Sequence, residues 1–329
     1  MTTPQSPPQP SAVGQVFEFR LWAAIVEQSA GRLHVFLPLA DRGVDALVHR
    51  ISDGTYFCVQ AKGRSSLRNG EVYLVVRSTA LVDDDVLLIG GLIVEGGLGP
   101  VVLAAPVRDF KRLAEKTTVR GEVVYQMGFG MHPRSDSRWL PFLMPLESLV
   151  QRFGVTEKAG FEELVGEPLP SWRSDLGFHG ESEVTLLLSA CAGLNLFRPF
   201  PDLETCELAV LHRQNRRVVG LQIKTISVDG DHPREPVMVQ ASSFRPNPTT
   251  YFVVLAWLRD QNRFHEESLL IPSNDIRSVA QPKELKGHLA FDWHPGASSQ
   301  PRLDVYRREL SRLALDVETI LLGERTSRV

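Results

Sequence analysis

One polar pattern occurs twice in this chain, each time at the end of a run that otherwise has the composition of a buried β-strand. Residues 44–62 read VDALVHRISDGTYFCVQAK, and residues 206–224 read CELAVLHRQNRRVVGLQIK. In both segments an acidic residue stands seventeen positions before a lysine, and a glutamine stands two positions before that lysine. Burial of an amide and an ammonium without partners is costly. Because this chain places a glutamine and a lysine in two apolar strands, we expect these side chains to have a function.

The similarity extends well beyond these segments and predicts a tandem duplication. Residues 33–63 align with 194–225 with one residue inserted, and residues 17–31 upstream align with 180–193. Downstream, APVRDFKRLA in the first copy corresponds to IPSNDIRSVA in the second. A repeat of this length is the signature of one structural unit written twice.

The polar, proline-containing stretch VGEPLPSWRSD (165–175) is the expected boundary between the copies. The 329 residues, 43% of them hydrophobic, are enough to build two domains of ordinary size. The first residues are rich in proline and glutamine and predict disorder. We therefore expect a disordered tail, two domains and a linker, with the bounds 1–12 for the tail, 13–164 and 176–329 for the domains, and 165–175 for the linker.

Each copy predicts the same order of secondary structure. A helix comes first, because apolar residues recur at helical spacing until Gly31 in one copy and Gly193 in the other. Strands follow, and then a helix begins near Val107 or Ser273. This order predicts an α/β fold in which a mixed central sheet is flanked by helices. The expected strands cover 33–37, 44–50 and 85–94 in the first copy and 194–198, 207–212 and 251–258 in the second, besides the two that carry Gln-x-Lys.

Composition limits the compartment and the partners of the chain. Its formal net charge of −3 gives no overall basic field for nucleic acid, so any such surface must be local. The three cysteines lie far apart, in apolar surroundings and without metal-binding spacing, which predicts reduced core thiols. No apolar run approaches the length of a membrane span, and the N-terminus lacks a signal peptide. We expect a cytoplasmic protein with no membrane partner.

The repeated polar residues have the chemistry of a metal site for phosphodiester hydrolysis. Side chains alternate along a strand, so Gln60 and Lys62 point the same way. If Asp45 lies on the neighbouring strand and Glu18 projects from the first helix, these groups converge at one edge of the sheet. Carboxylate and amide oxygens are ligands suited to Mg²⁺ (or Mn²⁺). A lysine beside the ion adds positive charge where a phosphate oxygen or an attacking hydroxide lies.

These residues resemble the PD-(D/E)xK nuclease superfamily, and most of all its Mrr-like restriction endonuclease and Holliday-junction-resolvase-like branch, in which glutamine often replaces the second acid. The resemblance implies two tandem restriction-endonuclease-like domains and Mg²⁺-dependent cleavage of DNA. It implies that Asp45 is a metal ligand, that Gln60 supplies an oxygen to the metal, and that Lys62 orients or activates water. Glu18 would be the metal ligand or base borne by the helix.

In the second copy the resemblance gives the matching places to Glu207 and Gln222 as metal ligands, to Lys224, and to Glu181 or its neighbour Glu183. This copy departs from the family pattern, because Glu207 stands where the family usually has aspartate. The Pro201–Asp202 dipeptide offers Asp202 as a rival ligand, but its distance from Gln222 fits the family less well. The first copy is therefore the better candidate for activity.

Several features have a structural alternative. Glu18 could be a surface residue in the first turn of a helix, where negative charge is favourable. The turn HRQNRR (212–217) could grip phosphates or be a solvated hairpin tip. The segment GGLIVEGGLG (90–99) lacks a phosphate-loop lysine and is expected to be a turn between strands. The run 302–322 has apolar residues at helical spacing, Val305, Leu310, Leu313 and Val317 among them, and is expected to be a helix.

Two functions are consistent with the pattern. The first is a metal-dependent endonuclease whose two fused units act as a pseudo-dimer on DNA. The second is a catalytically degenerate nuclease-fold protein that serves as a nucleic-acid-binding or scaffold component of a bacterial defence or DNA-processing system. RNA remains open as the substrate, because the catalytic groups engage phosphate and not the sugar.

Overall fold

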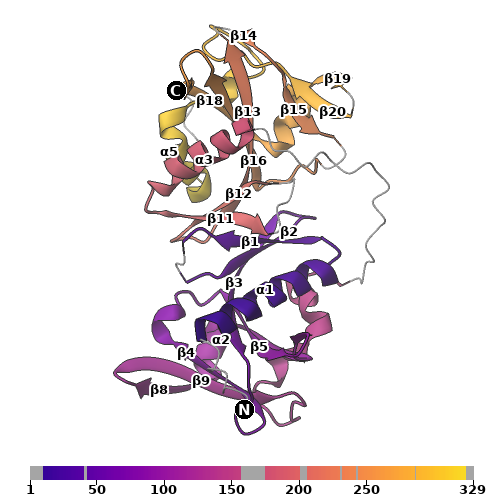
Figure 1. Ribbon diagram of the computed structural model, residues 1–329, viewed down its shortest axis with the longest axis vertical. Coiled ribbons are helices and arrows are strands. Elements are labelled where there is room, and N and C mark those ends of the chain that lie inside the picture. Colours follow the sequence, from indigo (N-terminus) through magenta and orange to yellow (C-terminus); the bar gives the residue numbers. More distant parts are fainter. Residues whose placement is uncertain are drawn as a thin grey trace, which may run out of the picture. The chain divides into compact units, whose positions relative to one another are not determined.

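The computed structural model describes residues 10–40, 43–156, 175–200, 206–229, 232–241, 244–285 and 287–323. The chain forms two compact units, and the expected α/β class is confirmed in each (Figure 1). The predicted linker lies outside the described residues except for Asp175, and the first helix begins at Pro10, inside the predicted tail. Unit 1 consists of Met1–Val35, Asp41–Arg50 and Tyr56–Glu163, and unit 2 of Phe36–Ala40, Ile51–Thr55 and Leu164–Val329.

The first half of the chain contains one long helix, two sheets and several short helical turns. In chain order these elements are α1 (Pro10–Gln28), β1 (Leu33–Pro38), β2 (Ala46–Arg50), β3 (Thr55–Arg64), β4 (Glu71–Arg77), the 3-10 turn η1 (Ser78–Ala80), β5 (Leu87–Val94), β6 (Gly97–Leu98), β7 (Val101–Pro106), α2 (Val107–Leu113), β8 (Glu115–Val119), β9 (Glu122–Gly130), η2 (Leu140–Phe142), β10 (Leu143–Pro145) and η3 (Leu146–Phe153).

The central sheet of this half has the strand order β10-β7-β5-β3-β2-β1. Strands β3 and β5 are parallel, with Gln60 opposite Leu88 and Lys62 opposite Gly90. Strands β7 and β10 add antiparallel beyond β5, so the sheet is mixed. Helix α1 lies across this sheet (Figure 1), and a small antiparallel sheet forms in the order β4-β9-β8.

The second half has the same order of elements in its central sheet, and its small sheet has shorter strands. Its elements are α3 (Asp175–Ser189), β11 (Leu194–Phe200), β12 (Leu208–His212), β13 (Val218–Asp229), β14 (His232–Pro233), β15 (Val237–Gln240), β16 (Thr250–Leu258), β17 (Arg263–Phe264), β18 (Glu267–Pro272), η4 (Ser273–Asp275), α4 (Ile276–Val279), β19 (Gln281–Leu285), β20 (His288–Phe291), η5 (Asp304–Tyr306), β21 (Arg307–Glu309), η6 (Leu310–Arg312) and α5 (Leu313–Leu322).

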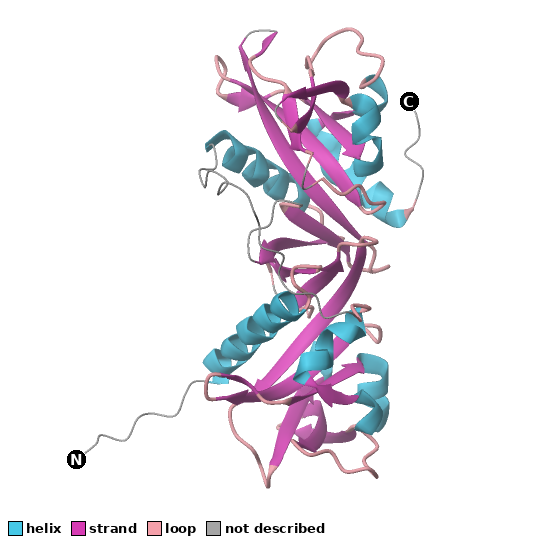
Figure 2. Cartoon of the chain, turned by 90° about the vertical axis from the view of Figure 1, so that its right-hand side faces the viewer, coloured by secondary structure: helices cyan, strands magenta, loops and turns pink. Residues whose placement is uncertain are grey.

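The two halves share one topology. The central sheet of the second half has the order β11-β12-β13-β16-β18-β21, and its small sheet has the order β15-β20-β19. Strands β13 and β16 are parallel, with Gln222 opposite Phe252, just as Gln60 lies opposite Leu88. In both units the strands form a twisted layer with helices packed beside it (Figure 2). Each Gln-x-Lys therefore lies on the central strand, next to its parallel neighbour.

The sheet of unit 2 is buried on both faces. One face packs under α3 and α5 through a cluster that includes Val184, Leu188 and Val317. The other face packs under the small sheet and α4 through Val237, Phe291 and neighbouring residues. This three-layer arrangement explains why β16 is apolar along nearly its whole length.

The first helix ends as the sequence predicts. Leu21, Trp22 and Ile25 are fully buried on one face of α1, and Gly31 adopts a positive φ of 74° just beyond it. The segment 90–99 is the expected turn between strands, since it contains the end of β5, a bend at Gly96 with φ of 76°, and the short strand β6. Glycine is favoured at both positions because positive φ carries no steric penalty there.

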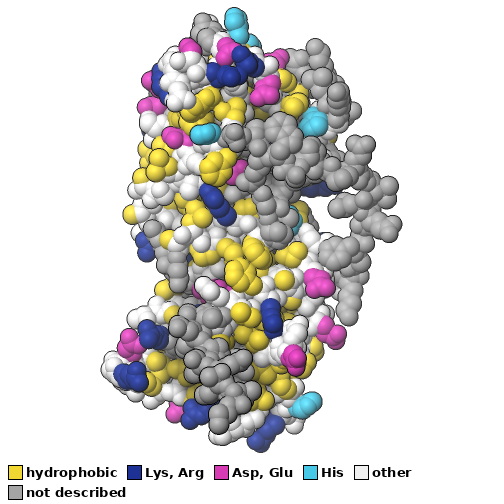
Figure 3. Space-filling view, viewed as in Figure 1, with side chains coloured by type: hydrophobic (Ala, Val, Ile, Leu, Met, Phe, Trp, Pro, Cys, Tyr) yellow, Lys and Arg dark blue, Asp and Glu magenta, His cyan; other side chains and the backbone are white. Residues whose placement is uncertain are grey.

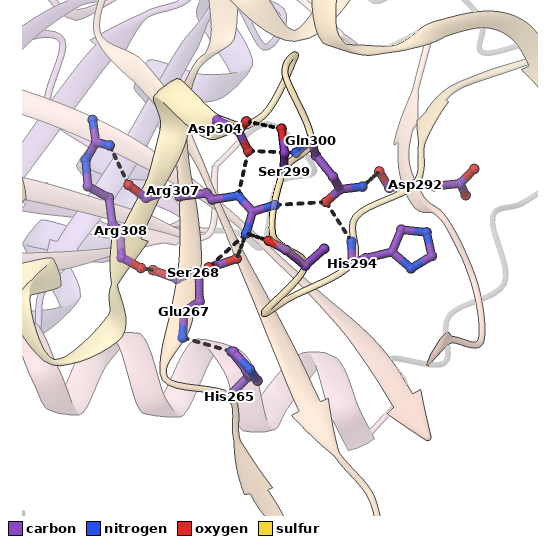
Figure 4. Close-up of polar contacts among 11 residues, drawn as sticks. His265, Glu267, Ser268, Asp292, His294, Ser299, Gln300, Asp304, Arg307 and Arg308 are labelled. Atoms are coloured by element: carbon purple, nitrogen blue, oxygen red, sulfur yellow. Dashed lines mark hydrogen bonds and ion pairs between the residues drawn. The ribbon is translucent and has the colours of Figure 1, made fainter. Parts of the chain in front are cut away.

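The prediction of one helix over 302–322 is wrong in its first half. Residues 304–312 form η5, β21 and η6, and only Leu313–Leu322 is α-helical. Residues 304–312 are not one helix because Arg307 is held by tertiary contacts. Its Nη1 atom donates to both oxygens of Glu267 at 2.9 and 3.0 Å and to the Ala297 carbonyl at 3.0 Å (Figure 4). These contacts and the β18–β21 ladder outweigh helical periodicity, and Val305 is exposed.

Two expectations drawn from composition can be compared with the described residues. None of the described helices is long and apolar enough to cross a membrane. None of the three cysteines forms a disulfide within the described residues; Cys206 is buried, and its Sγ atom donates to the Leu208 carbonyl at 2.9 Å, whereas Cys58 and Cys191 are half-buried.

We expect His34 to make the protein sensitive to acid. Burial lowers the pKa of His34 from 6.5 to about 4, although a hydrogen bond to the Gly31 backbone opposes this shift. The folded state therefore holds His34 neutral while the unfolded chain takes up a proton below pH 6.5, so stability is lost as pH falls from 6.5 toward 4. The full loss is about 3 kcal/mol.

His34→Asn, which introduces the residue found at the matching position Asn195, should reduce this loss. Urea unfolding at several pH values between 4 and 7.5 measures it, with the exposed His132→Asn as the matched control. Equal pH dependence in wild type and His34→Asn would contradict the assignment.

Candidate functional site

The candidate site of unit 1 is built around the carboxylate of Asp45. Its backbone N–H donates to the Val59 carbonyl at 2.9 Å, and its Oδ2 atom accepts the Ala61 N–H at 2.8 Å. The same oxygen contacts the Lys62 Nζ atom at 3.2 Å. The Asp45 side chain is 12% exposed and that of Lys62 is 27% exposed. The structure thus brings together the acid and the lysine that the sequence places seventeen residues apart.

Gln60 contributes a buried oxygen to this group. The side chain is 2% exposed, and its Nε2 atom donates to the Ala80 carbonyl in η1 at 2.9 Å. A carbonyl can only accept, so this bond fixes which end of the amide is oxygen. The Oε1 atom is buried and receives no hydrogen bond from the described residues. An orphaned acceptor of this kind is costly, and a cation would satisfy it.

Helix α1 approaches the strand directly beside Lys62. A Cβ atom on Gly63 would overlap the Cβ and Cγ atoms of Phe17, so only glycine allows this packing. Glu18 follows Phe17 in the helix and is half-buried, and it has partners of its own. The close approach therefore brings the backbone of Glu18 to the end of β3 that carries Lys62.

Unit 2 forms the equivalent group with a different carboxylate geometry. The Glu207 N–H donates to the Leu221 carbonyl at 3.0 Å, and its Oε2 atom accepts the Ile223 N–H at 2.8 Å. The other oxygen, Oε1, lies 3.6 Å from Lys224 Nζ. Gln222 is buried in the same strand, and it too has a partner.

Electrostatics distinguish the two acids that α3 offers. Burial raises the pKa of the Glu207 carboxyl, while Lys224 and the Ile223 N–H lower it and the negative charge of Glu181 raises it further. Glu181 is therefore near Glu207, as the sequence predicts. Glu183 instead lines a cavity of about 720 Å³ together with His179 and Trp257. The rival ligand Asp202 lies outside the described residues.

Helix α3 is positioned by a packing contact that mirrors that of α1. A Cβ atom on Gly180 would overlap the Thr225 side chain, which follows Lys224. In unit 1 the large residue is on the helix and the glycine on the strand, whereas in unit 2 the glycine is on the helix. Either order allows the helix to lie close to the strand, and the acidic residue follows this contact in both.

The basic turn 212–217 has structural partners that favour the hairpin-tip interpretation. Asn215 Nδ2 donates to the Leu321 carbonyl at 2.9 Å, and the Arg217 guanidinium lies against Gly323, which ends α5. In unit 1, Arg50 donates to the Phe153 carbonyl at 2.7 Å beside the matching Gly154. An arginine at the carboxyl end of a helix neutralises the unsatisfied carbonyls there.

The donor set of unit 1 fits a divalent cation bound by oxygen. Both contacts of the Asp45 carboxylate with described residues use Oδ2, which leaves Oδ1 for a ligand, and Gln60 adds an oxygen without a donor. The described residues contain no cluster of three or more histidines, cysteines or acids that could hold a metal. A cation here would keep several waters, as Mg²⁺ commonly does.

Sequence reasoning missed the main-chain part of the site. The Ala61 and Ile223 N–H groups and the Ala80 carbonyl hold the functional side chains, yet main-chain groups leave no mark in sequence. The one available signal was the glycine after Lys62, which reports the approach of α1.

Comparisons with known proteins give little further guidance. No protein-family model matches the chain, and no curated protein matches it. Among solved structures, a bacterial homing endonuclease aligns with 44% of this chain and 94% of its own length, at 14% identity and a TM-score of 0.32. A likeness of this size does not assign an activity, which depends on the side chains described above.

We expect Gly63→Ala to destabilise the protein by about 1–3 kcal/mol, because the added methyl group must displace Phe17. In a Phe17→Ala background, which by itself costs about 3–5 kcal/mol, the same change should cost much less. Denaturant unfolding of the four proteins measures this coupling. Gly97→Ala is the control, since a Cβ atom there meets nothing within 4 Å. Equal costs of Gly63→Ala in both backgrounds would show that α1 does not pack on β3 in this way.

We expect Glu207 to oppose folding at neutral pH. Because the pKa of Glu207 is raised in the folded state, the folded protein keeps a proton that the unfolded chain has released. The free energy of unfolding is therefore highest below the ordinary glutamate pKa of 4.5 and decreases as pH rises above it. Glu207→Gln should therefore gain stability relative to wild type as pH increases from about 4.5 to 7. Thermal unfolding measures the difference, with the exposed Glu115→Gln as control. A constant difference across this range would refute the assignment.

Proposed function

We propose that the chain is a metal-dependent endonuclease that hydrolyses phosphodiester bonds of DNA, and that it contains two fused copies of one nuclease unit. The observation that carries this proposal is the contact between Asp45 and Lys62, on a strand in which Gln60 has a buried Oε1 atom without a donor among the described residues. The shared topology of the two halves supports a duplication.

The chemistry assigns one role to each side chain of unit 1. Asp45 Oδ1 and Gln60 Oε1 would hold Mg²⁺, and Glu18 on α1 would be the further carboxylate. The bound ion supplies Lewis-acid activation of the phosphate and a lowered pKa of bound water. Lys62 stays beside Asp45 and provides positive charge to orient the attacking water and to stabilise the negative charge that develops on the phosphate oxygens. The water oxygen forms a bond to phosphorus, one ester P–O bond breaks, and the departing oxygen takes up a proton.

The nucleic-acid surface is expected to be local. On the face shown in Figure 3, lysine and arginine side chains are scattered among acidic and hydrophobic ones. With a net charge of −3, long-range attraction to DNA is weak, and contacts near the scissile phosphate must supply most of the affinity.

A binding or scaffold role is the second candidate. The observation that favours it is the ion pair between Lys62 and Asp45, in which the two opposite charges are paired without any ligand. In that case the polar pattern serves the fold, and nucleic acid would be bound without being cut.

Cleavage of supercoiled plasmid, a branched junction, single-stranded DNA and RNA with Mg²⁺ or Mn²⁺ tests the proposal. We expect Lys62→Ala to lower the rate about a hundredfold or more, because it removes a charge that acts on the transition state. The exposed Lys116→Ala should behave as wild type.

Cleavage that survives in the Lys62→Ala, Lys224→Ala double variant would point to a contaminating nuclease. Absence of cleavage by wild type on every substrate, with binding retained in a fluorescence polarisation assay, would favour the scaffold role.

A further inference from the structure

We propose that the two copies have divided their roles: the site at Asp45 binds the catalytic cation, the site at Glu207 does not, and the chain cuts one strand at a time. This inference rests on the proposed function and assigns the cation to one of its two units. The two sites differ in how their carboxylates contact the neighbouring donors.

Asp45 meets both of its internal donors with one oxygen. The Ala61 N–H and the Lys62 ammonium reach the same Oδ2 atom, at 2.8 and 3.2 Å. The short side chain allows this, since its carboxylate lies close to the backbone of β3. A cation can therefore use Oδ1 while both contacts remain.

Glu207 divides the same two donors between its two oxygens. Oε2 accepts the Ile223 N–H at 2.8 Å, and Oε1 faces Lys224 Nζ at 3.6 Å. The additional methylene moves the carboxylate outward and turns it so that each oxygen has one donor. A cation at Oε1 is repelled by the Lys224 ammonium beside that oxygen, and a cation at Oε2 has to share that oxygen with the Ile223 N–H, so neither oxygen of Glu207 is without a donor.

The amide of unit 1 adds a second reason for a single site. The bond from Gln60 Nε2 to the Ala80 carbonyl fixes the amide, and its Oε1 atom is buried without a donor among the described residues. A cation bound to this oxygen would remove the free-energy cost of burying an acceptor without a donor.

A single loaded unit fixes the form of the product. One hydrolytic centre breaks one phosphodiester bond in each encounter with a duplex. Supercoiled plasmid should therefore become open circles first, and linear molecules should appear only after a second, independent cut.

Titration of the full chain with Mn²⁺, followed by calorimetry and by the electron paramagnetic resonance signal of the unbound ion, tests the assignment. We expect one Mn²⁺ per wild-type chain and a loss of affinity of at least about tenfold in Asp45→Asn. The reciprocal swap is sharper: Asp45→Glu should abolish the single site, and Glu207→Asp should raise the stoichiometry to two. Melting curves show that each variant is folded.

Two equal sites in wild type, no binding at all, or loss of the site in Glu207→Gln would overturn the proposal. So would direct conversion of supercoiled plasmid to linear DNA. One Mn²⁺ lost in Asp45→Glu, without any cleavage by wild type, would support the division of roles and reject the nuclease activity. Cleavage with two Mn²⁺ per chain would support the nuclease activity and reject the division of roles.

Discussion

The acidic residue before the second strand holds each candidate site together. Asp45 donates its backbone N–H to the Val59 carbonyl and accepts the Ala61 N–H with its side chain, so its two bonds lie on either side of Gln60. Glu207 does the same around Gln222 through Leu221 and Ile223. This pairing fixes the register of the strand, and register decides which face each side chain occupies. The positions of the glutamine and of the lysine two residues later follow from it.

The first helix of each unit depends on a second constraint, which is the space beside the lysine. One member of the helix–strand contact must be glycine, and the two units solve this in opposite ways, with Phe17 against Gly63 and Gly180 against Thr225. The larger side chain is on the helix in unit 1 and on the strand in unit 2, and the helix lies close to the strand in both. In both units an acidic residue, Glu18 or Glu181, directly follows the helix residue that makes this contact, even though the sequence around it differs.

Much of the fold could be predicted from sequence because the pattern was present twice. Strand alternation, the helix-ending glycines and the order of elements all appear in both copies, and the sheet topology follows from that order. The segment before α5 could not be predicted, since Arg307 finds Glu267 and the Ala297 carbonyl only in the folded chain. For the same reason the sequence placed the acid near the lysine but gave no sign that the main chain of Ala61 and Ala80 would hold the site.

The repeated polar pattern also has a structural explanation that separates scaffold from catalysis. An acceptor is needed beside Ala61 and beside Ile223 to fix the strand, and either aspartate or glutamate meets that need. The proposed cation would use an oxygen that has no donor, and Asp45 leaves Oδ1 without one among the described residues, whereas both oxygens of Glu207 have a donor beside them. Sequence records that an acid is present, but not how many of its oxygens are engaged. Under the proposed division of roles, the second unit retains every polar residue of the site and yet does not bind the metal.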